Sequence, residues 1–415
     1  MKNGDLILSS RDYKIDFVLL LIYSLLPGIY KVIDNQMFMI FSVPIILYLL
    51  YRHWHKNLFY RWDIFFLFLL FYLLFLNIVQ FFSPYTNTLG MFMGIFLDVI
   101  PMAGFLFSRL IHLKDFIRLI VPIGLIHLII GILLYPMFGI VDLLGKIGEI
   151  LTDGVAFGRM ASVSGSLGFA SLMFMTSIGA LYYKRKYFLF LLFGVICAAQ
   201  RSGWLACFYG MVLFCYGNLK RGDGRYVKYL IIGIVLFIVL LSYLISTTGF
   251  DISFFMQRFE DLDSAAGERN GQWIEGWNNF VCMPIGAGNG QIGQVAARYE
   301  ESFYNMVPDG DYFRVLSEYG IMGGLFYIVI LFLYGITLFS IKKSTSLQRC
   351  CILSIFGGLC IQMIGSNITE FFFTNFLYWT FVGYLFVELN LIFVSRKKEN
   401  NETHIVSDAH PMGLD

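Results

Sequence analysis

Residues that could carry out chemistry are concentrated in one polar segment, which runs from about Asp251 to Glu318. It holds four arginines, eleven acids and no lysine, so its net charge is −7. Guanidinium groups suit phosphate oxygens because they present a planar fork of N–H donors, and carboxylates can act as general bases. The segment thus has the residue types needed to hold an anionic leaving group and to activate a hydroxyl.

Three carboxylates, Asp309, Asp311 and Glu318, stand at the end of this segment. Asp309 is the candidate general base, and Asp311 and Glu318 are candidates for binding sugar hydroxyls. The alternative is that the carboxylates form ion pairs with Arg314 and Arg298. The sequence leaves both interpretations open for Asp311 and Glu318.

A short helix is predicted over Ala266–Trp277, with Arg269, Trp273 and Trp277 on one face at intervals of four residues. One interpretation is an amphipathic helix on the bilayer surface, with its aromatic rings toward the lipid. A compatible interpretation is that this helix holds Arg269 at the level of a lipid phosphate. The rings of Trp273 and Tyr312 are candidate contacts for sugar.

A glycine-rich stretch, Gly286–Gly290, follows this helix. It lacks the preceding strand, the glycine spacing and the lysine of a nucleotide-binding loop. It predicts a turn at which the backbone passes close to another group, and Gly288 is the candidate contact to a phosphate.

Two further arginines lie beside apolar segments. Arg201 separates two apolar runs in Gln200-Arg201-Ser202-Gly203, and Arg159 precedes a stretch of serine and glycine. A charge at membrane depth is costly, so Arg201 either reaches water or headgroups or binds an anion. The small residues after Arg159 favour close helix packing. Arg159 itself, like Arg258 in the polar segment, is a candidate for assisting anion binding.

The composition indicates what holds these residues. Of the 415 residues, 58% are hydrophobic and 14% are charged, and the mean hydropathy is +0.71. Soluble chains carry about a quarter charged residues, so the sequence predicts an all-α polytopic membrane protein. The net charge of +2 indicates neither nucleic-acid binding nor a basic surface patch.

About twelve membrane-spanning helices are expected, because a span needs ~20 mostly apolar residues. They are predicted near 15–33, 36–51, 63–83, 87–108, 116–139, 161–183, 187–199, 203–218, 228–248, 320–341, 349–366 and 370–392. Residues 1–248 would carry the first nine helices, 249–319 one large loop with most of the active site, 320–392 the last three helices, and 393–415 a disordered tail.

Lysine and arginine are concentrated in alternate connections, which places both termini in the cytoplasm. This arrangement requires two separate spans to meet at the break at 199–203. A single helix through the break would place the cluster Lys220–Lys228 on the non-cytoplasmic side. Arg159, Arg201 and the large loop then share the non-cytoplasmic side, which makes the loop periplasmic.

No metal or cofactor site is indicated. Apart from Cys282, the seven cysteines lie in or beside apolar segments, and none of the six histidines lies in the large loop. Paired CxxC motifs and HExxH are absent from the sequence. We therefore expect no metal, no cofactor and no disulfide framework.

The order of these features resembles the O-antigen polymerase and O-antigen ligase superfamily, which are bacterial inner-membrane glycosyltransferases of the GT-C kind. The resemblance covers roughly Gly158 to Gly324. It is carried by Arg201 after an apolar run, Arg269 in a large outer loop, the glycine-rich turn, and the series Asp309…Tyr312…Leu316…Glu318…Gly320…Gly323.

This resemblance implies an enzyme that acts at the periplasmic face on glycans carried by undecaprenyl diphosphate, without a nucleotide sugar or a metal. Residues corresponding to Arg201 and Arg269 would bind the diphosphate and stabilise its developing charge. Arg159, Arg258 and Arg314 would assist. The implied partners are the lipid-linked oligosaccharide, membrane lipids and, from the family only, a chain-length regulator; no nucleic acid is implied.

Ligases of this superfamily carry a His-Asn pair where this chain has Asp309-Gly310. This difference favours an O-antigen polymerase. The first alternative is an O-antigen ligase, which transfers glycan from the same donor to lipid A–core. The second is a transporter or flippase for lipid-linked sugars, which is expected to show inverted repeats and charges within its spans; the sequence shows neither.

Overall fold

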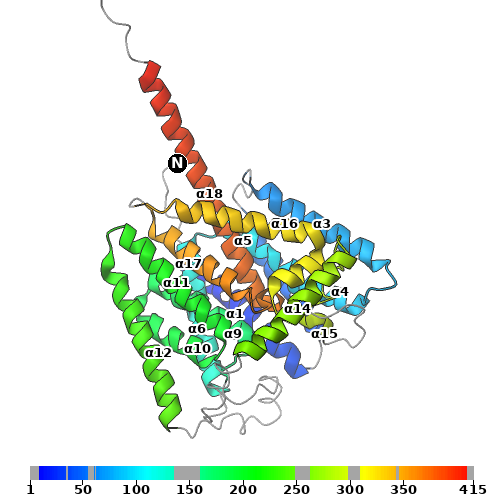
Figure 1. The fold of residues 1–415 in the computed structure, drawn as a ribbon. Helices are drawn as coiled ribbons and strands as arrows, with labels where there is room; N and C mark the ends of the chain where they lie inside the picture. Colours follow the sequence, from blue (N-terminus) through cyan, green and yellow to red (C-terminus); the bar gives the residue numbers. More distant parts are fainter. Residues whose placement is uncertain are drawn as a thin grey trace, which may run out of the picture.

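The computed structural model describes residues 9–33, 36–54, 60, 62–134, 159–247, 262–297, 309–342 and 345–408. These residues form helices and connections, and they contain no β-strand (Figure 1). Helices are expected in a lipid environment because each helix satisfies its own backbone N–H and C=O groups. The predicted all-α class is confirmed.

The bounds of the elements follow the apolar runs of the sequence. In chain order the α-helices are α1 (Ser10–Ile33), α2 (Ser42–Arg52), α3 (Asp63–Phe81), α4 (Thr88–Gly94), α5 (Ala103–Leu110), α6 (Leu113–Leu133), α9 (Gly165–Tyr183), α10 (Phe188–Cys197), α11 (Arg201–Lys220), α12 (Val227–Thr247), α14 (Leu262–Cys282), α15 (Gln294–Ala297), α16 (Asp311–Phe339), α17 (Leu347–Gln362) and α18 (Phe372–Asp408). Short helical turns are η1 (Gln36–Phe41), the π-helical η2 (Ile95–Val99), η3 (Ile100–Met102), η5 (Arg185–Tyr187), η6 (Gly224–Tyr226) and η7 (Ile368–Glu370).

Each predicted span overlaps at least one helix in the described part of the chain. Within the described part of the chain, six helices are long and apolar enough to cross a membrane: Asp63–Phe81, Thr88–Leu110, Leu113–Leu133, Gly165–Tyr183, Asp311–Phe339 and Phe372–Val394. The chain is therefore a helical membrane protein. Twelve crossings and a periplasmic position of the large loop stay predictions.

Two boundaries differ from the prediction. α16 starts at Asp311 rather than near 320, because Gly320 kinks a helix that has already begun; its φ is 62°. α18 continues to Asp408, so residues 393–408 are helical rather than disordered. No glycine or proline, the strongest helix breakers, occurs between Gly383 and Asp408.

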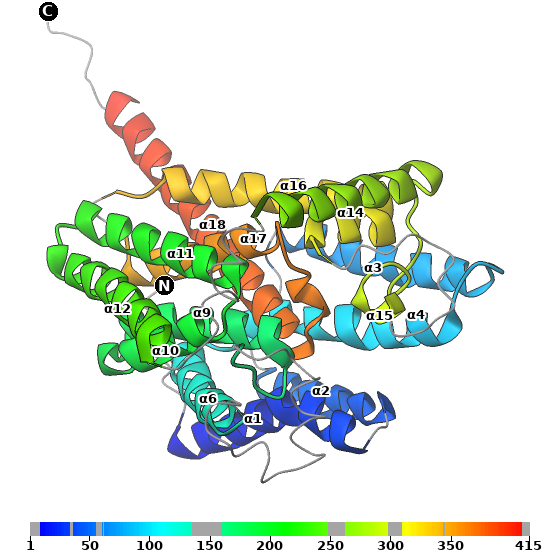
Figure 2. The same cartoon turned by 60° about the horizontal axis from the view of Figure 1, so that its bottom comes forward.

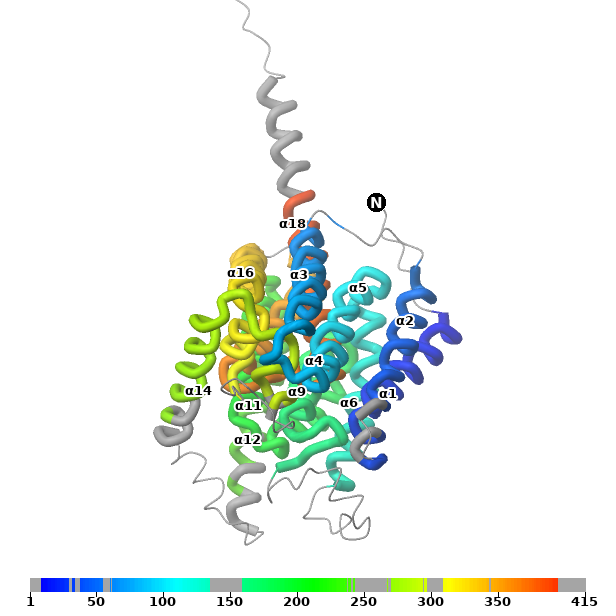
Figure 3. Tube along the Cα trace, turned by 90° about the vertical axis from the view of Figure 1, so that its right-hand side faces the viewer, coloured from blue at the N-terminus to red at the C-terminus, as the bar shows by residue number. Residues whose placement is uncertain are grey.

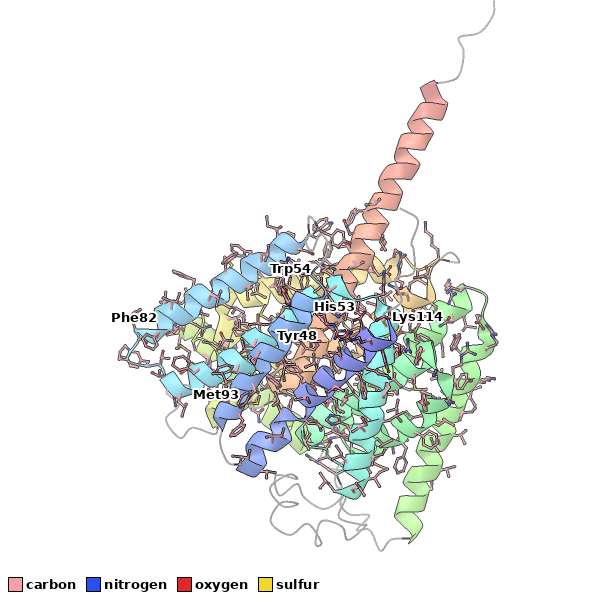
Figure 4. The ribbon with its side chains drawn as sticks, turned by 180° about the vertical axis from the view of Figure 1, so that it is seen from behind. Tyr48, His53, Trp54, Phe82, Met93 and Lys114 are labelled. Atoms are coloured by element: carbon pink, nitrogen blue, oxygen red, sulfur yellow. The ribbon has the colours of Figure 1, made fainter. Side chains whose placement is uncertain are left out.

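The helices differ in how much of their surface other helices cover (Figures 2 and 3). In the most apolar part of α9, 83% of residues are buried, whereas the values for α3 and α16 are 33% and 39%. The uncovered surface is apolar: Phe82, which is 79% exposed, and Tyr48 point outward (Figure 4). Exposed large apolar side chains on long helices are what a hydrocarbon solvent favours.

Charged side chains inside the bundle are paired. Arg109 on α5 bonds Asp63 at the start of α3, with Nη2–Oδ1 at 2.5 Å and Nε–Oδ2 at 3.3 Å. Its Nη1 donates to the Gly383 carbonyl of α18 at 2.6 Å. One guanidinium thus fixes three helices to one another.

Arg109→Ala should lower the free energy of unfolding by about 3–5 kcal/mol, because it leaves Asp63 buried without its cation. The control is Arg225→Ala, which breaks an ion pair between an exposed arginine and a partly exposed aspartate in a connection and should cause no measurable change. Denaturation of the purified protein in mixed micelles would measure both. Similar losses in the two variants would contradict this assignment.

Candidate functional site

The predicted break between two apolar helices is present. α10 ends at Cys197 and α11 begins at Arg201, and Ala199 between them has a φ of 50°. It is the only non-glycine residue with positive φ in the described part of the chain. Such a conformation costs about 1–3 kcal/mol and persists where the surroundings impose it. Arg201 is partly buried at the first position of α11.

The Arg159 segment lies against this break. Met160 donates its N–H to the Cys197 carbonyl at 2.8 Å, and Gln200 Nε2 donates to Ser166 Oγ at 2.8 Å. The Nε of Arg159 is buried and has no hydrogen-bond partner among the described residues. Two arginine-bearing segments that are about forty residues apart thus meet at one end of the bundle.

A histidine that the sequence analysis did not single out anchors the Arg159 segment. His127 on α6 is fully buried, with Nδ1 2.8 Å from Ser162 Oγ and Nε2 3.0 Å from Ser24 Oγ. The Ser24 hydroxyl donates to the Leu21 carbonyl at 2.7 Å. Nε2 therefore carries the imidazole proton and Nδ1 accepts from Ser162, an assignment that follows from the network.

The connection between α17 and α18, residues 363–371, joins the break to the large loop. Ser366 Oγ lies 2.8 Å from the hydroxyl of Ser202, the neighbour of Arg201. The Met363 carbonyl accepts the N–H of Asp311 at 3.0 Å.

This connection also binds the Asp311 side chain. Thr369 donates to it from its N–H at 3.0 Å and from Oγ1 at 2.6 Å. The sequence analysis missed this role. The signal that could have revealed it is the polar run from Ser366 to Glu370 between two apolar segments.

Arg314 is the centre of a buried ion-pair network. Its Nη1 lies 2.5 Å from Glu318 Oε2 and 3.3 Å from Asp98 Oδ2, and its Nε lies 3.2 Å from Asp311 Oδ1. Nη2 donates to Thr369 Oγ1 at 2.5 Å. The Arg314 side chain is 1% exposed. The ion-pair interpretation thus describes Asp311 and Glu318, whereas substrate contacts of these residues and of Arg314 stay predictions.

The acids of this network also hold the backbone of the large loop. Glu318 Oε1 accepts the N–H groups of Ile292 at 3.1 Å and Gly293 at 3.4 Å. Glu370 Oε1 accepts the N–H of Val295 at 3.2 Å. Hydrogen bonds from N–H donors are what a carboxylate needs when it has left water.

The glycine-rich stretch forms a turn at which the backbone passes close to another group, as predicted, and that group is the protein itself. The N–H groups of Ala287 and Gly288 donate to the carbonyls of Ser317 at 3.0 Å and Glu318 at 2.9 Å. These carbonyls lie just before the kink of α16 at Gly320. Because the Gly288 N–H donates to the Glu318 carbonyl, it is not available to a phosphate. The predicted contact between Gly288 and a phosphate stays a prediction.

The helix predicted over Ala266–Trp277 is present as part of α14. Trp273 and Trp277 do not share one environment, however. Trp273 stacks on Phe313 of α16, with ring centres 5.5 Å apart, whereas Trp277 is 52% exposed. A four-residue step rotates a position by about 40° around a helix, which separates the two rings. Only Trp277 has the outward orientation predicted for both.

Asp309 lies between α14 and the start of α16. Its N–H donates to Gln272 Oε1 at 3.1 Å, and the following Gly310 caps α16. The indole Nε1 of Trp273 is buried against Gly310 and has no hydrogen-bond partner among the described residues. Helical spacing places position 269 one turn before these two contacts. α14 therefore brings Asp309 near the position that carries Arg269.

Two arginines of the large loop, Arg258 and Arg269, stay predictions as diphosphate contacts. Arg258 lies outside the described residues, and of Arg269 only the backbone is described. Tyr312 donates its hydroxyl to the Cys360 carbonyl at 3.0 Å. Within the described residues, no group of three His, Cys, Asp or Glu side chains is arranged to hold a metal ion.

Residues 187–328 match the family model described as O-antigen ligase. This segment is an O-antigen ligase family domain. It takes in the α10–α11 break with Arg201, α14, the glycine-rich turn and Asp309, and it covers about a third of the chain. No curated protein matches the chain. The match confirms the resemblance of this segment to the O-antigen polymerase and ligase superfamily.

In the O-antigen ligase domain, Gly290→Ala should lower the stability by roughly 2 kcal/mol or more. Gly290 has a φ of 70°, and an added Cβ would overlap the Gly90 carbonyl. The matched control is Gly271→Ala in α14, where the Cβ would meet no atom within 4 Å. That change should be neutral or stabilise by up to about 1 kcal/mol. Thermal unfolding in detergent measures both; equal shifts would sink the prediction.

Arg314→Gln should cost about 3–5 kcal/mol, because it leaves Asp98, Asp311 and Glu318 buried without their shared cation. The expected result is a low yield of monodisperse protein by size-exclusion chromatography. A variant that folds and unfolds like the wild type, and loses only glycan transfer, would show instead that Arg314 contacts substrate.

Proposed function

We propose that the protein is an O-antigen polymerase of the inner membrane. It transfers a growing glycan from undecaprenyl diphosphate to a lipid-linked oligosaccharide repeat unit at the periplasmic face. One observation carries this proposal: hydrogen bonds through Ser366 and Met363 link the Arg201 break to Asp311, two residues from Asp309. Cationic and acidic candidates that are over a hundred residues apart are thereby held at one end of the bundle.

The proposed transfer uses these groups in complementary roles. A hydroxyl oxygen of the acceptor sugar forms a bond to the anomeric carbon of the donor glycan, and the bond between that carbon and the diphosphate oxygen breaks. The diphosphate leaves with the electron pair, and Arg201 and Arg269, assisted by Arg159 and Arg258, stabilise its charge. Asp309 accepts the proton of the attacking hydroxyl.

The charge of the large loop is consistent with these roles. Its net charge of −7 would oppose binding of a diphosphate if all its acids faced the ligand. Asp311 and Glu318 instead bind Arg314 inside the protein. Arginines at the α10–α11 break and on α14 then form a local cationic pocket.

The O-antigen ligase is the second candidate, and the description of the matching family favours it. It would use the same donor site and a different acceptor, lipid A–core. The Asp309-Gly310 pair, which stands where the ligases of the superfamily carry His-Asn, favours the polymerase. A transporter of lipid-linked sugars would not convert its cargo, so purified protein that turns lipid-linked repeat units into a ladder of products excludes it.

Complementation of a deletion strain tests the proposal. Asp309→Asn and Arg269→Ala should each reduce chain elongation by about 10²-fold or more and remove the glycan ladder, while single repeats on lipid A remain. Asp223→Asn, at the far end of α11, serves as the control and should give a normal ladder. Loss of all capped product, single repeats included, would identify a ligase or flippase. Normal ladders from both site variants would refute the assigned roles.

A further inference from the structure

Two short connections form one basic surface at the end of α11 opposite to Arg201. They are residues 184–187, between α9 and α10, and residues 220–228, which run from the last residue of α11 through its connection into the start of α12. The 20 residues of α11 separate this surface from Arg201 by about 30 Å. Arg185 joins the connections, because its Nη2 donates to the Tyr226 hydroxyl at 2.7 Å and its guanidinium lies 4.4 Å from the centre of that ring. We call residues 184–187 and 220–228 the two-loop surface.

The two-loop surface is strongly and openly cationic. It contains seven lysines and arginines and a single acid, Asp223, which Arg225 binds with Nη2–Oδ2 at 2.8 Å. Four lysines are exposed, and none of them takes part in an ion pair among the described residues: Lys184, Lys186, Lys220 and Lys228. The net charge of the chain gave no indication of a basic patch, because acids elsewhere in the chain offset these bases in the total. Folding brings the bases of the two segments together.

Each of these lysines lies beside a tyrosine ring. The distances from Nζ to the ring centre are 5.2 Å for Lys184 and Tyr183, 4.9 Å for Lys186 and Tyr187, 5.5 Å for Lys220 and Tyr216, and 5.3 Å for Lys228 and Tyr229. A ring face attracts an ammonium group and leaves its outward N–H donors for another anion. Tyrosine and lysine at the ends of membrane helices lie at the level of the lipid headgroups.

Three arginines near the ends of other helices are already neutralised. Arg109 is bound by Asp63 and Arg349 by Glu388, and Arg52 lies 3.4 Å from Asp16. The positive charge that favours one membrane side therefore has internal partners at those positions. At the two-loop surface Arg225 has Asp223, but the four exposed lysines have no ion-pair partner among the described residues, so they are open to an external anion.

We propose that the two-loop surface binds the phosphodiester headgroup of an anionic phospholipid, with lysines of both connections on one headgroup. The position at the end of α9, a helix able to cross a membrane, favours a lipid over a soluble acidic partner. The lipid would hold the ends of α9, α10, α11 and α12 together from outside the protein. This proposal does not depend on the proposed polymerase activity.

Titration of the delipidated full-length protein tests it. Phosphatidylglycerol and phosphatidylcholine are added separately, and retained lipid is counted by native mass spectrometry. The wild type should retain phosphatidylglycerol in preference, and Lys184→Gln/Lys186→Gln/Lys220→Gln should bind it about tenfold more weakly or worse. The matched control removes three exposed lysines elsewhere: Lys14→Gln/Lys114→Gln/Lys342→Gln. It should bind within about twofold of the wild type.

If both connections bind one headgroup, then the lysines of each connection are required for binding. Changing Lys184 and Lys186 alone, or Lys220 and Lys228 alone, should each remove most of the preference, and Tyr226→Phe should weaken it without altering the charge. Equal losses in the patch and control variants would show diffuse charge rather than a site and overturn the proposal. So would wild-type retention by the patch variant, or equal retention of the two lipids.

Discussion

Arg314 carries a positive charge in the interior of a helical membrane protein, where its side chain is 1% exposed. Removing such a charge from water costs several kcal/mol unless carboxylates and hydrogen-bond acceptors surround it. Those partners come from three places: Glu318 and Asp311 from α16 itself, Asp98 from the π-turn η2, and Thr369 from the α17–α18 connection. Each charged group is stable in the interior only when the segments that carry its partners are packed around it.

The same network gives two acids of the large loop, Asp311 and Glu318, a structural role. A carboxylate beside Arg314 is also an acceptor for backbone N–H groups, and Glu318 and Glu370 use this capacity to hold residues 292–295. One acid at the end of the loop and one in the α17–α18 connection thus attach the loop to the helices. The diphosphate site of the proposed enzyme then depends on where the remaining arginines lie, and the network leaves Asp309 and α14 at the edge of the buried part.

How much of an interaction the sequence predicts depends on how far apart in the chain its partners lie. Apolar runs specify helices locally, and the polar residues at Arg201 specify the break between α10 and α11. Spacings of three and four residues make the pairing of Arg314 with Asp311 and Glu318 one of two predicted outcomes. Asp98 lies more than two hundred residues from Arg314, and no local pattern connects them. The divergence of Trp273 from Trp277 likewise depends on which face of α14 packs on α16, which only the tertiary structure decides.

The interruptions of the helices constrain how an anion can be held. Irregular backbone at membrane depth needs partners inside the protein, and the carbonyls of Ser317 and Glu318 at the kink of α16 find theirs in the N–H groups of Ala287 and Gly288. The glycine-rich turn resembles a phosphate-binding loop in composition only, because its N–H groups serve the kink. The N–H groups of Ala287 and Gly288 are therefore not free to bind an anion in the proposed site. Arginine suits this role better than lysine, because its planar fork supplies paired donors where backbone N–H groups are already used.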